Sequence, residues 1–320
     1  MNKNRMVRLE RKTVEALDIC SFEFVDANGE NLPPFSAGSH IDVHLPNGLV
    51  RQYSLCNDPT ETHRYLIAVL RDPSSRGGSI AMHELAQGQS LTISEPKNHF
   101  ALAHQATHSL LLAGGIGITP VLCMAERLSN IGAPFTLHYG SRSPERTAFA
   151  SRIEASAFAR SVFFHHDSGE AQQKLDVDAL LAEQPMGTHL YVCGPTGFMN
   201  AVLNAARQSA WSEDRLHREY FSAATPALGG ADGSFEVQIA SSGRVISVAA
   251  DRSVVAALAQ AGIEVPVSCE QGVCGTCLTR VIEGTPDHRD MFLTPDEQAC
   301  GDQFTPCCSR SKSARLVLDL

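Results

Sequence analysis

The chain lacks a long hydrophobic run, an apolar signal segment and any excess of positive charge. Although 43% of its 320 residues are hydrophobic, no apolar stretch approaches the roughly 20 residues that a membrane-spanning helix needs. The opening MNKNRMVRLERK is charged and leads into no apolar signal core. The formal charge of −9 disfavours nucleic acid and anionic membranes as partners, and it permits a partner with a basic patch. We therefore expect a cytoplasmic protein.

Internal repeats and low-complexity tracts are missing as well, and 320 residues are enough for two or three domains with separate cores. Ten cysteines without a secretion signal argue against a disulfide framework, because cytosolic thiols stay reduced. The thirteen histidines, including His165, His166 and His288, show no pairing with cysteine at metal-ligand spacing. We expect them to be surface or core residues.

Three sequence textures follow one another along the chain. Residues 1–103 alternate short β-rich runs with turn clusters, which predicts an antiparallel β-barrel. Residues 104–223 change to βα units, which are typical of a doubly wound α/β domain. The Gly-rich stretch 224–234 is the expected linker. Residues 235–320 have the hairpin, helix and loop layout of a small β-grasp ferredoxin fold.

The α/β block contains two runs that are predicted to be buried strands, PFTLHYG at 134–140 and SVFFHH at 161–166. Helices are expected near 121–130 and 199–210, each after a glycine-containing turn.

Three cysteines in the run SCEQGVCGTCLTR, followed about thirty residues later by PCCSR, form the strongest motif of the chain. Cys269, Cys274 and Cys277 have the C-x4-C-x2-C spacing of a plant-type [2Fe–2S] centre. Gly272 and Gly275 would let the backbone fold around such a cluster. The alternative is a zinc ribbon, but that would favour two C-x2-C pairs, and only Cys274 and Cys277 form one.

The fourth ligand has three downstream candidates, Cys300, Cys307 and Cys308. In an extended segment adjacent side chains point to opposite faces, so only one of Cys307 and Cys308 is expected to serve the cluster. The region resembles plant-type ferredoxins, in which one cysteine precedes a small residue, and this resemblance places Cys307 at the ligand position. The remaining cysteines are expected to be buried thiols: Cys20, Cys56, Cys123, Cys193 and Cys300.

Two motifs in the predicted barrel are suited to a flat, phosphorylated cofactor. In RQYSLCN, Arg51 supplies a planar cation, Tyr53 a ring that can lie on a heterocycle, and Ser54 a hydroxyl for its edge. In SRGGS, the segment Arg76–Ser79 precedes a predicted helix and could bind phosphate through its cation and backbone amides. The other interpretation of SRGGS is a glycine turn with a serine cap.

Two loops of the predicted α/β domain outline a dinucleotide cleft. GGIGITP lies between a strand and a helix, where the backbone can approach a pyrophosphate. CGP closes a later strand at the same carboxyl edge of the sheet, where α/β proteins bind ligands. The candidate residues are Gly114, Gly115, Gly117, Thr119, Cys193, Gly194 and Pro195.

The ordered combination of R-x-Y-S, GGIGITP, CGP and the ferredoxin loop resembles the phthalate dioxygenase reductase family, over essentially the whole chain. The resemblance implies a monomer that passes electrons from NADH through FMN and a [2Fe–2S] cluster to a Rieske-type oxygenase. Hydride would pass directly between nicotinamide and flavin, so no catalytic acid or base is expected.

The same resemblance assigns roles to individual residues. It implies that the SRGGS match selects FMN rather than FAD, that Phe221 covers the flavin and that Cys193 borders the nicotinamide. The alternative for Phe221 is a core residue at a domain border, and a core role is an equal alternative for Cys193. It gives flavin contacts to Arg51, Gln52, Tyr53 and Ser54, backbone contacts to Ala68, Val69 and Leu70, and the FMN phosphate to Arg76, Gly77, Gly78 and Ser79.

The sequence does not decide between NADH and NADPH, and it does not decide which molecule finally accepts the electrons. Arg142 and Arg146 could meet the 2′-phosphate of NADPH, while Ser143 replaces the acidic residue that would select a free ribose hydroxyl. NADH is therefore favoured by the resemblance alone. Two other functions remain: a self-contained NAD(P)H reductase of small acceptors, and a non-enzymatic iron–sulfur electron carrier.

Overall fold

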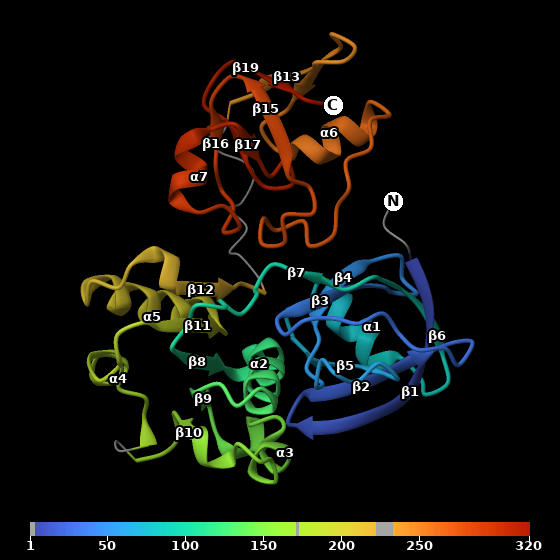
Figure 1. Ribbon diagram of the computed structural model, residues 1–320. Helices are drawn as coiled ribbons and strands as arrows, with labels where there is room; N and C mark the ends of the chain where they lie inside the picture. The colour runs from blue at the N-terminus through green and yellow to red at the C-terminus, as the bar shows by residue number, and fades with distance from the viewer. Residues whose placement is uncertain (1–3, 171–172, 222–232) are drawn as a thin grey trace. The chain divides into compact units, whose positions relative to one another are not determined.

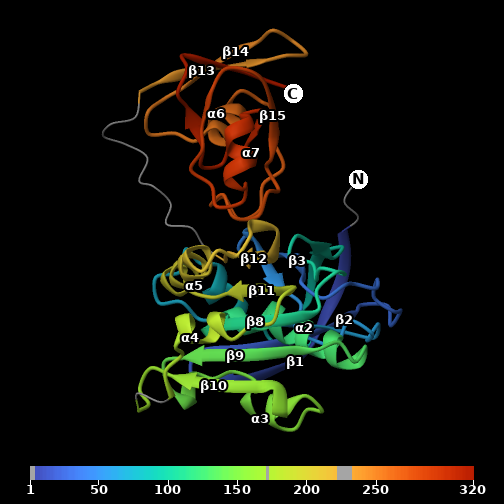
Figure 2. The same ribbon diagram turned by 60° about the vertical axis from the view of Figure 1, so that its left-hand side comes forward.

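The computed structural model describes residues 4–170, 173–221 and 233–320. The chain forms two compact units, Met1–Glu219 and Tyr220–Leu320 (Figures 1 and 2). The expected multidomain fold is confirmed: an antiparallel β-barrel and a parallel α/β domain make up the first unit, and a β-grasp ferredoxin fold makes up the second. Most of the expected linker at 224–234 lies outside the described residues, and the expected domain boundaries remain predictions.

The barrel is one antiparallel sheet with the strand order β4-β3-β6-β1-β2-β5, and β7 pairs with β3. Its end strands β4 and β5 approach each other, so the sheet curls into a barrel (Figure 1). The elements are β1 (Asn4–Ala16), β2 (Ile19–Asp26), β3 (Ser39–His44), β4 (Val50–Ser54), β5 (Tyr65–Leu70), α1 (Gly78–Glu84), β6 (Ser90–Ser94) and β7 (Lys97–Asn98).

The α/β domain is a parallel sheet with the order β10-β9-β8-β11-β12, so the strand order reverses beside the central β8. Ligands of such sheets bind at the carboxyl ends of the strands near this reversal. The elements are β8 (His108–Gly114), α2 (Ile118–Asn130), β9 (Phe135–Ser141), α3 (Ala150–Glu154), β10 (Val162–His166), α4 (Val177–Ala182), β11 (Thr188–Cys193), α5 (Thr196–Gln208) and β12 (Leu216–Glu219).

The barrel and the α/β domain share one apolar core. Cys56, Ala68 and Phe100 of the barrel belong to the same buried cluster as Leu111 and Tyr139 of the parallel sheet, and most side chains of α2 complete it. Removing this apolar surface from water stabilises the pair of domains as a single body.

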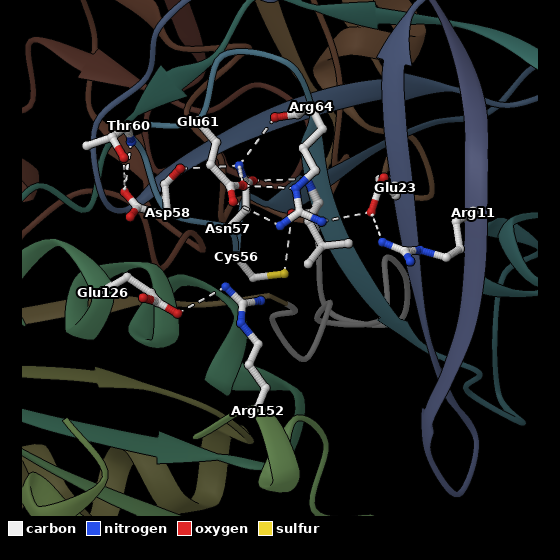
Figure 3. A network of polar contacts seen from close by, with 11 residues as sticks. Arg11, Glu23, Cys56, Asn57, Asp58, Thr60, Glu61, Arg64, Glu126 and Arg152 are labelled. Atoms are coloured by element: carbon white, nitrogen blue, oxygen red, sulfur yellow. Dashed lines mark hydrogen bonds and ion pairs between the residues drawn. The ribbon is translucent and has the colours of Figure 1, made fainter. Parts of the chain in front are cut away.

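The loop between β4 and β5 is held by charged side chains (Figure 3). Arg64 donates to Glu61 at 2.9 Å and to Glu23 on β2 at 2.8 Å. The Asn130 side chain, at the end of α2, donates to Asp58 in this loop at 2.6 Å. The segment that follows the RQYS strand is therefore fixed both to the barrel and to the α/β domain.

The second unit has a mixed sheet with the order β14-β13-β19-β15-β17 and a separate β16-β18 pair. The expected hairpin and helix are confirmed as β13, β14 and α6. Buried Arg310 donates to the carbonyls of Gly233, Ala249 and Arg252, which ties the start of this fold to its end. The elements are β13 (Phe235–Ile239), β14 (Val245–Val248), α6 (Val254–Gln260), β15 (Thr279–Glu283), β16 (Pro286–Asp287), α7 (Pro295–Cys300), β17 (Gln303–Phe304), β18 (Arg310–Ser311) and β19 (Arg315–Leu318).

Two burial predictions are wrong. The strand expected to be buried at 161–166 is β10, an edge strand whose side chains are all partly or fully exposed, because it has a neighbour on one side only. Cys300 is exposed at the end of α7, while the other four cysteines expected to be buried are confirmed. Within the described residues, no helix combines the length and the hydrophobicity that crossing a membrane would require.

Candidate functional site

The four cysteines of the C-x4-C-x2-C…C pattern come together in the second unit, where all four are buried. A hydrogen bond joins Cys269 to Cys274, and another joins Cys277 to Cys307. The first bond raises the pKa of the Cys269 thiol and lowers that of Cys274. A plant-type [2Fe–2S] cluster takes two cysteine thiolates on each iron. The two thiol pairs therefore match the ligand division that such a cluster requires.

Four cysteines could also hold a structural zinc, which needs four ligands around one centre. Across residues 4–170, 173–221 and 233–320, no three His, Cys, Asp or Glu side chains surround one point that could hold an ion.

Two glycines of the cluster loop have no room for a side chain. Gly272 has φ +72°, and a Cβ there would collide with the Cys308 sulfur and lie 2.9 Å from the Cβ of Asp290. Gly275 has φ +68°, and a Cβ there would lie 2.5 Å from a carbon of the Phe292 ring. Both positions require glycine, because L-residues rarely adopt this backbone conformation and the space is filled.

The sulfurs of this loop also receive hydrogen bonds from the backbone. The amide of Gln271 donates to Cys269 at 3.3 Å, and the amide of Thr276 donates to Cys274 at 3.5 Å. Donors of this kind stabilise thiolates and raise the reduction potential of a bound cluster.

The argument from an extended chain at Cys307 and Cys308 is wrong, because residues 306–308 form a turn. The two thiols are nevertheless distinguished by their surroundings. Cys307 is hydrogen-bonded both to Cys277 and to its neighbour Cys308, whereas the Cys308 sulfur lies 3.3 Å from the hydroxyl of Thr305 and packs against Gly272. The preference for Cys307 as fourth ligand thus rests on its pairing with Cys277.

The two barrel motifs proposed for the flavin meet in space. Arg51 on β4 lies across Gly78 at the start of α1, so that a Cβ on Gly78 would be 2.8 Å from its Nε atom. Asn47 donates to the carbonyl of Gly77, which has φ +95°. The structure thereby places a guanidinium, the amides that open α1 and the exposed Arg76 side by side, which suits a phosphate group.

The strands beside this phosphate cradle carry the other predicted flavin contacts. Tyr53 is largely shielded on β4, and burial raises the pKa of its hydroxyl. Among the described residues, β5 ends the path of the sheet and pairs with β2 on one side. The Val69 carbonyl on β5 accepts from a ring nitrogen of His83 at 2.9 Å, so part of the backbone expected to face the flavin is already engaged.

The structure shows where the remaining predicted cofactor-binding residues lie, and their roles stay predictions. Gln52 lies on β4 opposite Asp42, and the Ser79 hydroxyl accepts from the amide of Asp72 at 3.1 Å. Buried Thr119 donates to the carbonyl of Ile116. Phe221 is 39% exposed and follows Glu219 by two residues. Its role as a flavin cover stays a prediction.

The two loops of the dinucleotide cleft touch through their glycines. A Cβ on Gly117 would collide with the carbonyl of Cys193, and one on Gly194 would lie 2.9 Å from the Cα of Gly114. Gly115 has φ +53° and no atom within 4 Å of a Cβ position, so its backbone faces open space. Close packing therefore explains most of these glycines, and Gly115 is the one best placed for a ligand to approach. Cys193 is fully buried.

Glu219 is a functional candidate that the sequence analysis missed. Its carboxylate accepts from the Ser54 hydroxyl at 3.0 Å, and it lies opposite Cys193 across the β11–β12 pair. Loss of hydration raises the pKa of Glu219 to about 7. The side chain thus joins the predicted flavin strand to the predicted nicotinamide loop. Its one sequence signal was its place at the end of the last parallel strand, just before Phe221.

Two family models match segments of the chain. Residues 237–312 match the 2Fe-2S iron-sulfur cluster binding domain. Residues 93–216 match the N-terminal domain of dimethylamine monooxygenase subunit DmmA-like proteins.

Full-length relatives are similar to the chain from end to end. Vanillate O-demethylase oxidoreductase from Pseudomonas sp. (strain HR199 / DSM 7063) is 58% identical over 95% of this chain and 96% of its own. Tetrachlorobenzoquinone reductase from Sphingobium chlorophenolicum is 44% identical over 95% and 94%. The solved structure of phthalate dioxygenase reductase, described as passing electrons from pyridine nucleotides to [2Fe-2S], is 40% identical, with 99% and 98% coverage and a TM-score of 0.76.

The fourth cluster ligand can be tested with a matched pair of variants. We expect Cys307→Ser to lose the cluster, because the partner of Cys277 is removed. Cys308→Ser should keep it, because a hydroxyl can retain the contact with Thr305. Iron content and the EPR signal of the reduced protein show whether each variant keeps the cluster. An intact cluster in Cys307→Ser would show that the assignment is wrong.

The phosphate cradle predicts that Arg76→Ala weakens FMN binding by about 1.5–3 kcal/mol through loss of a charge-assisted hydrogen bond. Arg71→Ala, which removes another exposed arginine five residues earlier, is the control and should leave binding unchanged. Titration of the flavin-free protein with FMN measures the affinity, and mass spectrometry identifies the native cofactor. Release of FAD would contradict the argument.

The raised pKa of Glu219 predicts that the stability of the protein depends on pH. Its pKa is about 7 in the folded protein against an ordinary value of 4.5. The unfolded chain therefore loses this proton first as pH rises, so the free energy of unfolding should fall between pH 4.5 and 7. Because the side chain is only partly buried, we expect a loss of about 1–3 kcal/mol.

The variant Glu219→Gln keeps an oxygen acceptor for Ser54 but cannot titrate. Its stability should stay flat over the range in which the wild type declines. Denaturant unfolding at pH 5 and pH 8 measures both proteins. Equal losses in the two would mean that Glu219 does not cause the slope.

Proposed function

We propose that this chain, which belongs to the phthalate dioxygenase reductase family, passes electrons from NADH through FMN and a [2Fe–2S] cluster to a Rieske-type oxygenase component. The observation that carries the proposal is the pairing of four buried thiols in a ferredoxin fold that follows a flavin barrel and a nicotinamide domain in one chain. We further propose that the protein is a cytoplasmic monomer.

The residues of the first unit bind and orient. Arg51, Arg76 and the amides at the start of α1 would hold the FMN phosphate, while strands β4 and β5 would hold the ring system. Bound FMN supplies the conversion between the two electrons of a hydride and single electrons for the cluster.

The glycine loops after β8 and β11 receive NADH at the carboxyl edge of the sheet. Direct hydride transfer between bound NADH and FMN would need no side chain to act as acid or base, so these residues would bind and position the two cofactors. The hydrogen bond from Ser54 to Glu219 keeps the flavin strand in register with the nicotinamide loop.

The ferredoxin unit has a charge suited to docking. Residues 232–320 carry twelve acidic side chains against seven Lys and Arg, a formal charge of −5. We propose that this unit docks on a basic surface of the oxygenase. Charge attraction of this kind speeds encounter and weakens with salt, since the Debye length is about 8–10 Å near physiological ionic strength.

A second candidate acceptor is a quinone, because one 44% identical relative is named a tetrachlorobenzoquinone reductase. An enzyme of this kind would complete its reaction with a small acceptor and no protein partner. The purified protein with NADH and either a quinone or the co-purifying oxygenase separates the two functions.

Truncation tests the proposed division of labour. A protein ending at Ala231 keeps the whole compact unit Met1–Glu219. We expect it to retain FMN and to reduce ferricyanide with NADH at a rate within about twofold of the full chain, but to support no oxygenase turnover. Measuring oxygenase turnover at rising salt with the full chain tests the docking charge.

Oxygenase turnover by the truncated protein would show that the cluster is not the exit for electrons. A turnover rate that does not respond to salt would reject only the electrostatic docking.

A further inference from the structure

The loop after β9 is the place where this fold would distinguish NADH from NADPH. In α/β sheets the ribose 2′ position is recognised at the end of the strand beside the one that leads into the glycine turn. Here that strand is β9, which pairs with β8 so that Gly140 lies opposite Gly114. The residues that follow include Arg142, Glu145 and Arg146.

The loop is fixed from both sides. The hydroxyls of Ser141 and Thr147 each donate to the carbonyl of Ser143 at 3.1 Å. From the barrel, the amide of Leu17 in the β1–β2 turn donates to the carbonyl of Glu145 at 2.8 Å. A loop held in this way presents its charged side chains from defined positions.

Asp18 in the β1–β2 turn of the barrel forms an ion pair with Arg146, one of the two arginines of the loop. A guanidinium nitrogen of Arg146 lies 3.3 Å from a carboxylate oxygen of Asp18. Asp18 has φ +64°, so the tight β1–β2 turn holds it at this position. The pair is accessible, with 34% of the Arg146 side chain and 45% of the Asp18 side chain exposed.

The charges that remain at this edge are balanced. Arg142 and Glu145 are both exposed, and the Glu145 carboxylate accepts from the Ser143 hydroxyl. A dianionic 2′-phosphate needs surplus cations, whereas a ribose hydroxyl needs an acceptor. Ser143 stands where an acidic residue would accept a hydrogen bond from the ribose hydroxyl, and Glu145 offers a carboxylate two residues later.

We propose that Asp18, a residue of the flavin barrel, makes the enzyme select NADH by holding Arg146 away from the 2′ position of the coenzyme. Asp18 is thus a positioning residue that acts through Arg146. The inference rests on the proposed function, since it concerns the coenzyme of the same reaction.

The test uses full-length Asp18→Asn, which removes the charge and keeps a residue that tolerates positive φ. We expect kcat/KM for NADPH, with ferricyanide as acceptor, to rise about three- to tenfold while that for NADH changes by less than about twofold. The dissociation constant of NADP⁺, measured by calorimetry, should fall by a similar factor, and that of NAD⁺ should not.

Two further variants show whether Arg146 carries the effect. Arg146→Ala alone should leave the coenzyme ratio unchanged, and Asp18→Asn combined with Arg146→Ala should lose the gain. Glu15→Gln, which removes an acidic side chain from the same hairpin without contacting Arg146, is the control and should shift nothing.

An unchanged coenzyme ratio in Asp18→Asn, or a gain that persists without Arg146, would overturn the inference. So would a wild-type preference for NADPH. Wild-type reduction of ferricyanide by NADH would still uphold the proposed function, so the two ideas fail separately.

Discussion

The structure depends on the apolar core that the barrel and the parallel sheet share. Hydride transfer requires the donor and acceptor rings to be held in contact at a fixed angle. Two domains joined by a small polar interface would move relative to each other. Here Cys56 and Ala68 of the barrel are buried in one cluster with Leu111 of the sheet, so the flavin strands and the nicotinamide loops belong to one packed body.

This constraint explains why the conspicuous glycines lie where they do. Gly117 and Gly194 let the two nucleotide loops pack against each other, and Gly78 lets Arg51 lie on the start of α1. The Ser54–Glu219 hydrogen bond adds a polar link at the same boundary, and the Asp18–Arg146 ion pair adds another. The apolar core fixes the two domains, and these polar contacts hold side chains of one domain against the other.

The sequence predicted the three folds because each has a local signature: turn clusters for the barrel, glycine turns between strands and helices for the sheet, and cysteine spacing for the cluster. It could not predict Glu219 or Asp18, because their partners lie 165 and 128 residues away. Periodicity could not show that β10 is an edge strand, since edge position depends on sheet order. The extended chain expected at Cys307 and Cys308 is wrong, because residues 306–308 form a turn that the cysteine spacing does not reveal.

The division into two compact units follows from the two kinds of transfer. A hydride moves only between atoms in contact, so the proposed sites for nicotinamide and flavin should share a rigid body, and all their candidate residues except Phe221 lie within Met1–Glu219. A single electron can cross a gap without such contact, so the cluster does not have to lie in the same rigid unit as the flavin. The ferredoxin unit accordingly has its own core, into which Cys277 and Cys307 are packed. The side chains that pack around these thiols all come from residues 235–320, and none belongs to the core of the first unit.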